Sequence, residues 1–428
     1  MIVIVGGGLA GLVAAHALAT AGKEVTLLEA RSKLGGLVAS EEIGGVRFDI
    51  GAESYARRAT EVTDYLHGLG LETVLPAGRS WIWNGSPIQI PANTSLGIPA
   101  DPSSDEIAAI IADTERIKED LVLDPSIGAE ATTLAELVEA RMGTELLEKL
   151  VRPIAGAIYS TDPANLSINP KLKADFLETG SLAKAVAKGL SGPAIASVDG
   201  GMFRLVDALA EQAEEAGAEL VTGARVNSLD LTESGASVTA EIDGTSIAID
   251  AEHIILATDI RSSQFLLEQV MDLEPFEIPQ GKPTTHVSLV LDAPELDEAP
   301  RGSGLLCVQG TSRAKALTHL SSKWPWLRGV TDFHAIRVSY ALNEDLSTEQ
   351  ALQDANQLLG TQIDREAIVG ARVVRWGDAL TPSTPALRSW AEAITPPKQI
   401  TVTGAWRAGT GIAAVIPHAL ASAQSLID

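Results

Sequence analysis

The chain has 428 residues, 45% of them apolar and 21% charged, which excludes a disordered protein and a small binding module and predicts two or three folded domains. Its 56 acidic and 32 basic side chains give a formal charge of −24, and this field repels nucleic acid and anionic membrane surfaces. The one cysteine, Cys307, excludes an internal disulfide and a Cys-rich metal site, so we predict no metal and treat Cys307 as a small core residue.

The first predicted element is a strand at residues 2–5, whose sequence IVIV is typical of a strand buried on both faces in a parallel sheet. Gly6, Gly8 and Gly11 follow in the G-x-G-x-x-G spacing. This spacing allows a tight turn, close approach of a diphosphate and close packing of a helix on the strand. The helix that opens there ends at Gly22, and its N-terminus presents free N–H groups to the diphosphate.

A second strand, residues 24–30, ends around Glu29. A carboxylate at this point can accept both hydrogen bonds from an adenosine ribose, and it disfavours a 2′-phosphate. Strand, glycines, helix, strand and acid in this order predict a site for the ADP half of a dinucleotide. The pattern alone does not choose between FAD and NAD, and a glycine-rich turn without a nucleotide is the structural alternative.

Further along the chain, apolar residues at helical spacing predict a helix-rich section over about 105–189. Alternating segments such as 286–293 and 335–342 predict an antiparallel sheet within 261–389. The segment 399–427 then predicts a strand, a glycine-rich loop and a closing helix.

Several short motifs favour a flavin. Gly35 and Gly36, shortly after Glu29, resemble the second diglycine motif of the flavin amine oxidase and phytoene desaturase superfamily, although Lys33 and Leu37 stand where that motif has arginines. Residues 48–54 resemble its F-D-x-G-P-E-S segment beside the flavin ring, and an ordinary strand and turn is the alternative there. The superfamily's A-T motif is similar to Ala257–Thr258, and its adenine contact corresponds to the backbone of Val226.

Four longer stretches narrow the resemblance to the coproporphyrinogen and protoporphyrinogen oxidase family over essentially the whole chain. They are GAIYSTDPANLS (156–167), LETGSL (177–182), SSKWPW (321–326) and GTGIAAVIP (409–417). Within this family, IPANTSLGIPA (90–100) is similar to a stretch of the coproporphyrinogen-specific enzymes of Gram-positive bacteria.

The resemblance implies an α/β fold with a discontinuous Rossmann-like FAD-binding domain of the amine oxidase type. The expected domains are an FAD domain (1–79, 190–262 and 390–428), a helical subdomain (80–189) and a substrate domain with an antiparallel sheet (263–389). It also implies non-covalent FAD and the six-electron oxidation of coproporphyrinogen III to coproporphyrin III in haem biosynthesis, with O2 reduced to H2O2. Protoporphyrinogen IX oxidation, amine oxidation or desaturation on the same fold, and a purely structural use of FAD are the alternatives.

Motifs and resemblance together assign a set of residues to FAD. These are Gly6, Gly8, Leu9, Ala10, Gly11, Glu29, Ala30, Arg31, Gly35, Gly36, Gly51, Ala52, Glu53, Ser54, Val226, Ala257, Thr258, Trp376, Gly404, Gly411 and Ile412. Ordinary aromatic packing is the alternative for Trp376. No acid–base dyad is required by the sequence, because the flavin performs the redox step.

Other polar residues have weaker assignments. His286 lies about where related amine oxidases place a lysine near the flavin, and a hydrogen-bonded strand histidine is its alternative. Lys323 could bind a substrate propionate or support the fold. Arg57 and Arg58, and Lys171 and Lys173, could neutralise substrate carboxylates or be solvated surface charges.

Partners and location follow from the same features. We expect a cytoplasmic enzyme whose partners are a porphyrinogen and dioxygen, with ferrochelatase as a downstream partner and no nucleic acid. The sequence leaves open a peripheral contact with the inner face of the cell membrane. It does not define the oligomeric state.

Overall fold

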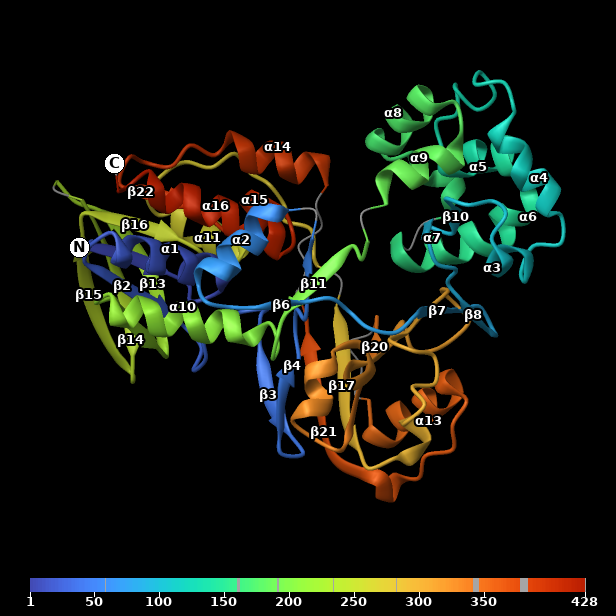
Figure 1. Ribbon diagram of the computed structural model, residues 1–428. Coiled ribbons are helices and arrows are strands. Elements are labelled where there is room, and N and C mark those ends of the chain that lie inside the picture. Colours follow the sequence, from blue (N-terminus) through green and yellow to red (C-terminus); the bar gives the residue numbers. More distant parts are fainter. Residues whose placement is uncertain are drawn as a thin grey trace. The chain divides into compact units, whose positions relative to one another are not determined.

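The computed structural model describes residues 1–57, 59–159, 162–190, 192–233, 235–281, 283–341, 346–377 and 384–427, without the side chains of residues 159 and 385 (Figure 1). It forms two compact units. The first unit comprises Met1–Pro76, Pro193–Thr284 and Val374–Asp428, and the second comprises Ala77–Gly192 and Thr285–Val373. The segments expected as a helical subdomain (80–189) and as a substrate domain (263–389) lie mostly together in the second unit. Their separation into two domains stays a prediction.

A five-stranded parallel sheet forms the centre of the first unit. In spatial order its strands are β12 (Glu219–Thr222), β2 (Val25–Glu29), β1 (Ile2–Val5), β16 (His253–Leu256) and β22 (Ile400–Val402). Successive side chains of β1 point to opposite faces, with Ile2 and Ile4 in one core cluster and Val3 and Val5 in another. The expected α/β fold with a doubly covered parallel sheet is therefore confirmed.

Each face of this sheet has its own cover (Figure 1). The core cluster of Ile2 and Ile4 includes helices α1 (Leu9–Thr20), α10 (Phe203–Glu215) and α16 (Ile412–Gln424). The cluster of Val3 and Val5 includes the antiparallel strands β13 (Ala224–Leu231), β14 (Ala236–Ile242) and β15 (Thr245–Ala251), with α11 (Ile260–Leu267) and α14 (Pro385–Ala393).

Smaller elements join distant parts of the first unit. They are the hairpin β3 (Ser40–Ile43) and β4 (Val46–Asp49), helix α2 (Thr60–Gly68), and a short sheet of β5 (Tyr55–Ala56), β11 (Ile195–Val198) and β6 (Thr73–Val74). The buried carboxylate of Asp49 accepts hydrogen bonds from the backbone N–H groups of Met202 (2.8 Å) and Phe203 (2.9 Å). Asp49 therefore caps the start of α10 from more than a hundred residues away.

A seven-stranded mixed sheet organises one part of the second unit. Its order is β21 (Ile368–Trp376), β17 (Thr284–Leu291), β20 (His334–Tyr340), β19 (Ala316–His319), β18 (Gly304–Cys307), β7 (Ser80–Trp83) and β8 (Pro87–Gln89). One face carries apolar residues that pack against α13 (Thr348–Leu359). Cys307 is buried in this core, and burial raises the pKa of its thiol to about 11, as expected for an unreactive core residue.

Helices form the other part of the second unit, and most of them are short. The main ones are α5 (Leu134–Met142), α7 (Arg152–Tyr159), α8 (Pro170–Thr179) and α9 (Leu182–Gly189). The helical pattern near residues 105–121 is divided into α3 (Asp105–Ala108), α4 (Thr114–Lys118) and a final 3-10 turn, because Asp113 accepts a hydrogen bond from the Arg116 amide and caps a new helix. Among the described residues, no helix is long and apolar enough to cross a bilayer.

Candidate functional site

Most of the candidate FAD residues of the first unit gather at one edge of its parallel sheet. The strands β1, β2, β16 and β22 all run in the same direction, so their carboxyl ends lie at the same edge. Gly6 follows β1, Glu29 ends β2, and Ala257 follows β16. Ligands of open α/β sheets bind at this edge, so the predicted residues share one location.

The glycine turn after β1 is as tight as the sequence pattern predicts. Gly6 has φ +107°, and a Cβ there would lie 2.8 Å from the carbonyl oxygen of Ala257. A Cβ on Gly11 would lie 1.9 Å from the oxygen of Gly6, so α1 can pack on the turn only with glycine at this position. A Cβ on Gly8 would meet no protein atom within 4 Å, which leaves room for a ligand beside the backbone.

Helix α1 starts at this opening. Its N-cap is Gly8, which has no side chain to cap the first turn. Leu9 and Ala10 begin the helix, so their N–H groups belong to the first turn, which has no acceptors within the helix. The helix dipole adds partial positive charge at the same point. An anionic diphosphate fits this arrangement.

Glu29 has a fixed position beside the turn. Its carboxylate accepts hydrogen bonds from the backbone N–H groups of Gly7 and Arg31, each at 2.7 Å. A carboxylate has about four acceptor positions, so it can also bind ribose hydroxyls. The neighbouring Ala30 lies at the end of the same strand. Sequence reasoning missed the contribution of Gly7, which only the folded turn brings next to the acid.

The second diglycine motif packs on the first. The Gly35 amide donates to the Gly7 carbonyl at 2.8 Å, and Gly35 forms a parallel bridge with Gly8. Both glycines of the motif have positive φ, +102° for Gly35 and +62° for Gly36, a conformation that other residues adopt at a cost. The motif therefore extends the backbone surface formed by the turn from Gly6 to Gly11. We call the turn and the motif together the cradle.

The segment Gly51–Ser54 lies against the diglycine segment. The Ala52 amide donates to the Leu37 carbonyl at 2.9 Å, and a Cβ on Gly51 would lie 2.1 Å from that same oxygen. Glu53 is buried and its backbone carbonyl accepts a hydrogen bond from the Ser197 hydroxyl at 2.8 Å, whereas Ser54 is half-buried. The contacts fix the backbone of a segment that the sequence places beside a flavin.

The last two candidate groups follow β16 and β22. A Cβ on Gly404, which has φ +117°, would lie 3.6 Å from the Thr258 carbonyl, so the two strand ends adjoin. Gly411 is the N-cap of α16 without a side-chain cap, and Ile412 is the first, buried residue of that helix. As in α1, the helix thus starts at a glycine where an added Cβ would meet no protein atom within 4 Å.

A histidine that the sequence analysis did not single out supports the chain directly after β22. His418 of α16 forms a hydrogen bond of 2.9 Å through Nδ1 to the hydroxyl of Thr403, the residue before Gly404. Burial lowers the pKa of His418, and the charge of Arg407 lowers it further. A neutral imidazole therefore holds the start of the loop, and only the contact between β22 and α16 reveals it.

The remaining candidates of the first unit lie on or next to other elements. Val226 lies on β13 next to a β-bulge. The Arg57 guanidinium donates to the Pro193 carbonyl at 3.2 Å, and its backbone amide donates to Ala194. Trp376 is the half-buried last residue of β21. Their assigned roles stay predictions.

The candidates of the second unit lie on separate elements. His286 is half-buried on β17, directly opposite Ser339 of β20. The Lys323 ammonium lies 5.1 Å from the centre of the Trp324 ring. Lys171 is 70% exposed and bonds Asp175 at 2.6 Å, and this bond, with one from Lys188, lowers the pKa of the Asp175 carboxyl.

Lys173, another predicted substrate residue, contacts backbone carbonyls of its own unit. The Lys173 ammonium donates to the carbonyls of Ala129 (2.5 Å) and Ala131 (2.8 Å), so it supports a loop within the second unit. Arg58 and the Ser160–Thr161 part of the 156–167 motif lie outside the described residues.

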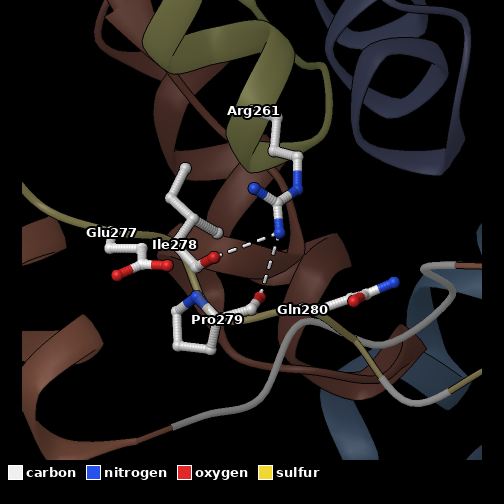
Figure 2. A pocket seen from close by; sticks show the side chains of 5 residues that line it. All are labelled: Arg261, Glu277, Ile278, Pro279 and Gln280. Atoms are coloured by element: carbon white, nitrogen blue, oxygen red, sulfur yellow. Dashed lines mark hydrogen bonds between the residues drawn. The ribbon is translucent and has the colours of Figure 1, made fainter.

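A surface pocket of about 590 Å³ lies in the first unit at the start of α11 (Figure 2). The Arg261 guanidinium reaches across it to the carbonyls of Ile278 (3.1 Å) and Pro279 (3.3 Å). Glu277 and Gln280 complete its lining. None of the residues assigned to FAD or substrate lines this pocket, and the Arg261 contacts tie the connection after α11 to the helix.

Comparison with known proteins identifies a family and several related sequences. The sequence profile of the flavin containing amine oxidoreductase family matches residues 9–426. A coproporphyrinogen III oxidase of Mycobacterium leprae is 29% identical, with 99% of this chain and 97% of that protein covered. A coproporphyrinogen III oxidase of Bacillus subtilis is 24% identical, with 76% and 74% covered.

A solved structure from Exiguobacterium sp. 255-15, provisionally named a protoporphyrinogen oxidase, has a TM-score of 0.78 at 21% identity, covering 100% of this chain and 98% of that one. The open Gly8, the uncapped start of α1 and the fixed Glu29 fit an FAD molecule, which these residues can hold through diphosphate and ribose. With a family match over almost its entire length, the chain belongs to the flavin containing amine oxidoreductases, and it is an oxidoreductase with FAD as its cofactor.

Proposed function

We propose that the protein oxidises coproporphyrinogen III to coproporphyrin III in haem biosynthesis. The overall reaction removes six electrons and six hydrogen atoms from the substrate and converts three O2 to three H2O2. The observation that carries the proposal is the similarity to the Mycobacterium leprae enzyme over the full length of both chains. The porphyrin product is then a substrate for metal insertion by a ferrochelatase.

The proposed roles of the FAD-assigned residues follow from their geometry. The N–H groups of Leu9, Ala10 and Gly11 at the start of α1 bind the diphosphate, because they are directed to the opening beside Gly8. Glu29 binds the ribose hydroxyls through the acceptor positions that Gly7 and Arg31 leave. When bound, FAD supplies the two-electron acceptor that the side chains of the protein lack.

The task of the protein chain in this reaction is positioning. Tight glycine turns and their backbone contacts fix the cofactor-binding backbone, which keeps the reacting atoms in place without an acid–base pair. The neutral His418 holds the start of the segment from Thr403 to Gly411, which includes the short helix α15 (Ala405–Ala408). We propose that this segment and the segment Gly51–Ser54 both contact the flavin part of the cofactor.

The test is aerobic turnover by the purified holoenzyme with coproporphyrinogen III and, separately, protoporphyrinogen IX. Porphyrin fluorescence and peroxide are followed together, with anaerobic reactions as a control for the acceptor. We expect faster oxidation of coproporphyrinogen III and three molecules of peroxide for each porphyrin formed. Faster oxidation of protoporphyrinogen IX would move the assignment to that substrate.

Two further outcomes test the alternatives. Flavin reduction by an amine, with no porphyrin formed from either porphyrinogen, would favour an amine oxidase of the same fold. A bound flavin that none of these substrates reduces would favour a structural use of FAD. Either result would contradict the proposed reaction and leave the family assignment unchanged.

A further inference from the structure

One face of the seven-stranded sheet in the second unit carries an unexpected row of polar side chains. Ser288 of β17 pairs directly with Arg337 of β20, and Arg337 pairs directly with Thr318 of β19. Directly paired residues of antiparallel strands lie on the same face of a sheet, with Cβ atoms about 4.5–5.5 Å apart. The three side chains therefore stand in a line across three adjacent strands.

Ser288 and Arg337 are both buried. Ser288 has no exposed surface, and its hydroxyl has no hydrogen-bond partner among the described residues. Only 6% of Arg337 is exposed. A buried hydroxyl without a partner destabilises a fold, so its presence in a well-packed sheet points to a partner from outside the chain.

The rest of the sheet shows that this polarity is not needed for packing. The opposite face is apolar, with Val287, Leu289 and Val338 packed in the core that includes α13. On the same face as the polar row, the neighbouring strands β7 and β18 carry Ile82 and Leu306, which pack in the core of the helical segment. Apolar side chains would thus suit the fold at the positions of Ser288 and Arg337.

We propose that Ser288, Arg337 and Thr318 bind a carboxylate of the substrate, which under the function proposed above is a propionate of the porphyrinogen. A guanidinium has five N–H donors, so Arg337 can keep contacts within the protein and still present two donors to a carboxylate. The Ser288 hydroxyl donates a third hydrogen bond. Thr318, half-buried on the next strand, closes the row on its other side.

The next row of the same face extends this site to His286, the residue of this sheet that was predicted to lie near the flavin. His286 pairs with Ser339, and Ser339 pairs with Ala316. This row lies two residues before Ser288 on β17 and two residues after Arg337 on β20, so a substrate anchored at Arg337 would extend along a polar strip. The site selects for ligands with carboxylates, and four propionates give coproporphyrinogen more ways to occupy it than the two of protoporphyrinogen.

The test measures binding of coproporphyrin III and of its tetramethyl ester to the holoenzyme by fluorescence quenching. The ester keeps the ring and removes the charges, so the ratio of the two dissociation constants reports carboxylate recognition. We expect Arg337→Met to weaken binding of the acid on the order of ten- to a hundred-fold, with the ester changed less than about two-fold. Arg337→Lys keeps the charge but removes the paired N–H donors of the guanidinium, so it should give an intermediate loss of affinity for the acid.

Ser288→Ala separates binding from folding. Loss of a buried hydroxyl without a protein partner should leave the melting temperature unchanged or higher. Binding of the acid should nevertheless weaken by about three- to ten-fold. Arg328→Met is the control, because it removes an arginine of the same unit that is 41% exposed and lies off the polar row. An unchanged acid-to-ester ratio in folded, FAD-loaded Arg337→Met and Arg337→Lys would overturn the proposal.

The site can be tested even if the porphyrinogen assignment fails. If the wild-type protein binds neither porphyrin, the proposed function falls, and octanoate is compared with octanamide by thermal shift. Stabilisation by octanoate that depends on Arg337 would still support a carboxylate site for another substrate. Equal shifts with the acid and the amide would refute the site as well.

Discussion

At the residue scale, one buried ion pair organises the helical part of the second unit. Arg141 and Asp120 are both fully buried, with Nε and Oδ1 2.6 Å apart. Asp120 also accepts hydrogen bonds from the Ser181 hydroxyl (2.6 Å) and the Leu182 amide (3.0 Å) at the start of α9. The pair therefore joins the turn after α4 to the first turn of α9.

Arg141→Met should lower the free energy of unfolding by about 3–5 kcal/mol, because it leaves the Asp120 carboxylate buried without its counter-charge. Urea unfolding measures this loss. Lys118→Met is the matched control, since Lys118 pairs with Glu115 at the surface, and it should cost less than about 1 kcal/mol. Similar losses in the two variants would contradict the importance of burial here.

A second residue-scale prediction concerns two buried histidines of the second unit. His319 Nε2 lies 3.3 Å from His334 Nδ1, and His334 Nε2 lies 3.0 Å from the Asp297 carboxylate. Burial lowers the pKa of His319 to about 3, helped by the charges of His334 and Arg328, and burial also lowers the pKa of His334. The His319 imidazole is thus neutral in the folded protein near pH 6.

Below about pH 6.5 the unfolded chain takes up protons that the folded His319 does not, so stability falls as the pH is lowered toward 3. His319→Gln should make this fall shallower by up to about 1.4 kcal/mol per pH unit between pH 6 and 4.5. Urea unfolding across this range checks it, with His67→Gln at an exposed position as the control. Parallel curves for wild type and His319→Gln would show that His319 is not responsible.

At the scale of elements, two glycines at the junction of β1 and α1 should have different effects when substituted, one on folding and the other on cofactor binding. Gly11→Ala places a methyl group 1.9 Å from the Gly6 oxygen, so it should displace α1 and cost at least about 2 kcal/mol of stability. Gly8→Ala meets no protein atom within 4 Å. It should leave the stability of the apoprotein nearly unchanged but weaken FAD binding at least about ten-fold, because the methyl group occupies the approach to the diphosphate.

Apoprotein melting temperature and FAD titration measure the two effects separately. Gly68→Ala, in α2, is the control, because its new methyl group also meets nothing within 4 Å and lies on another element. Gly8→Ala with wild-type affinity for FAD would place the diphosphate elsewhere.

At the scale of the whole molecule, the charge of −24 opposes the binding of the tetracarboxylate substrate that we propose. Added salt screens charges beyond about 8–10 Å and leaves contacts within a buried site such as that of Arg337 less affected. We therefore expect kcat/KM for coproporphyrinogen III to rise several-fold between 10 and 200 mM NaCl. The uncharged tetramethyl ester should show no such rise, and equal salt effects on the two substrates would point to a cause other than charge.

The sequence predicts those parts of the molecule whose causes are local. The strand, turn and helix that carry Gly6, Gly8 and Gly11 are consecutive, so their pattern is sufficient to locate the cradle. The cap that Asp49 provides for α10 joins residues more than a hundred positions apart and leaves no local signal. The row around Arg337 depends on strand register, since a shift by one residue would move its members to the opposite face.

The order of the chain through the first unit has a consequence during synthesis on the ribosome. The edge strand β22 and the helix α16, which packs on α1, both come after residue 399. Residues 1–76 therefore emerge first and wait for translation of the entire second unit before their sheet is complete. We therefore expect stable capture of the flavin to be a late event that requires β22 and α16, and a nascent chain that stops before residue 400 should emerge without the flavin.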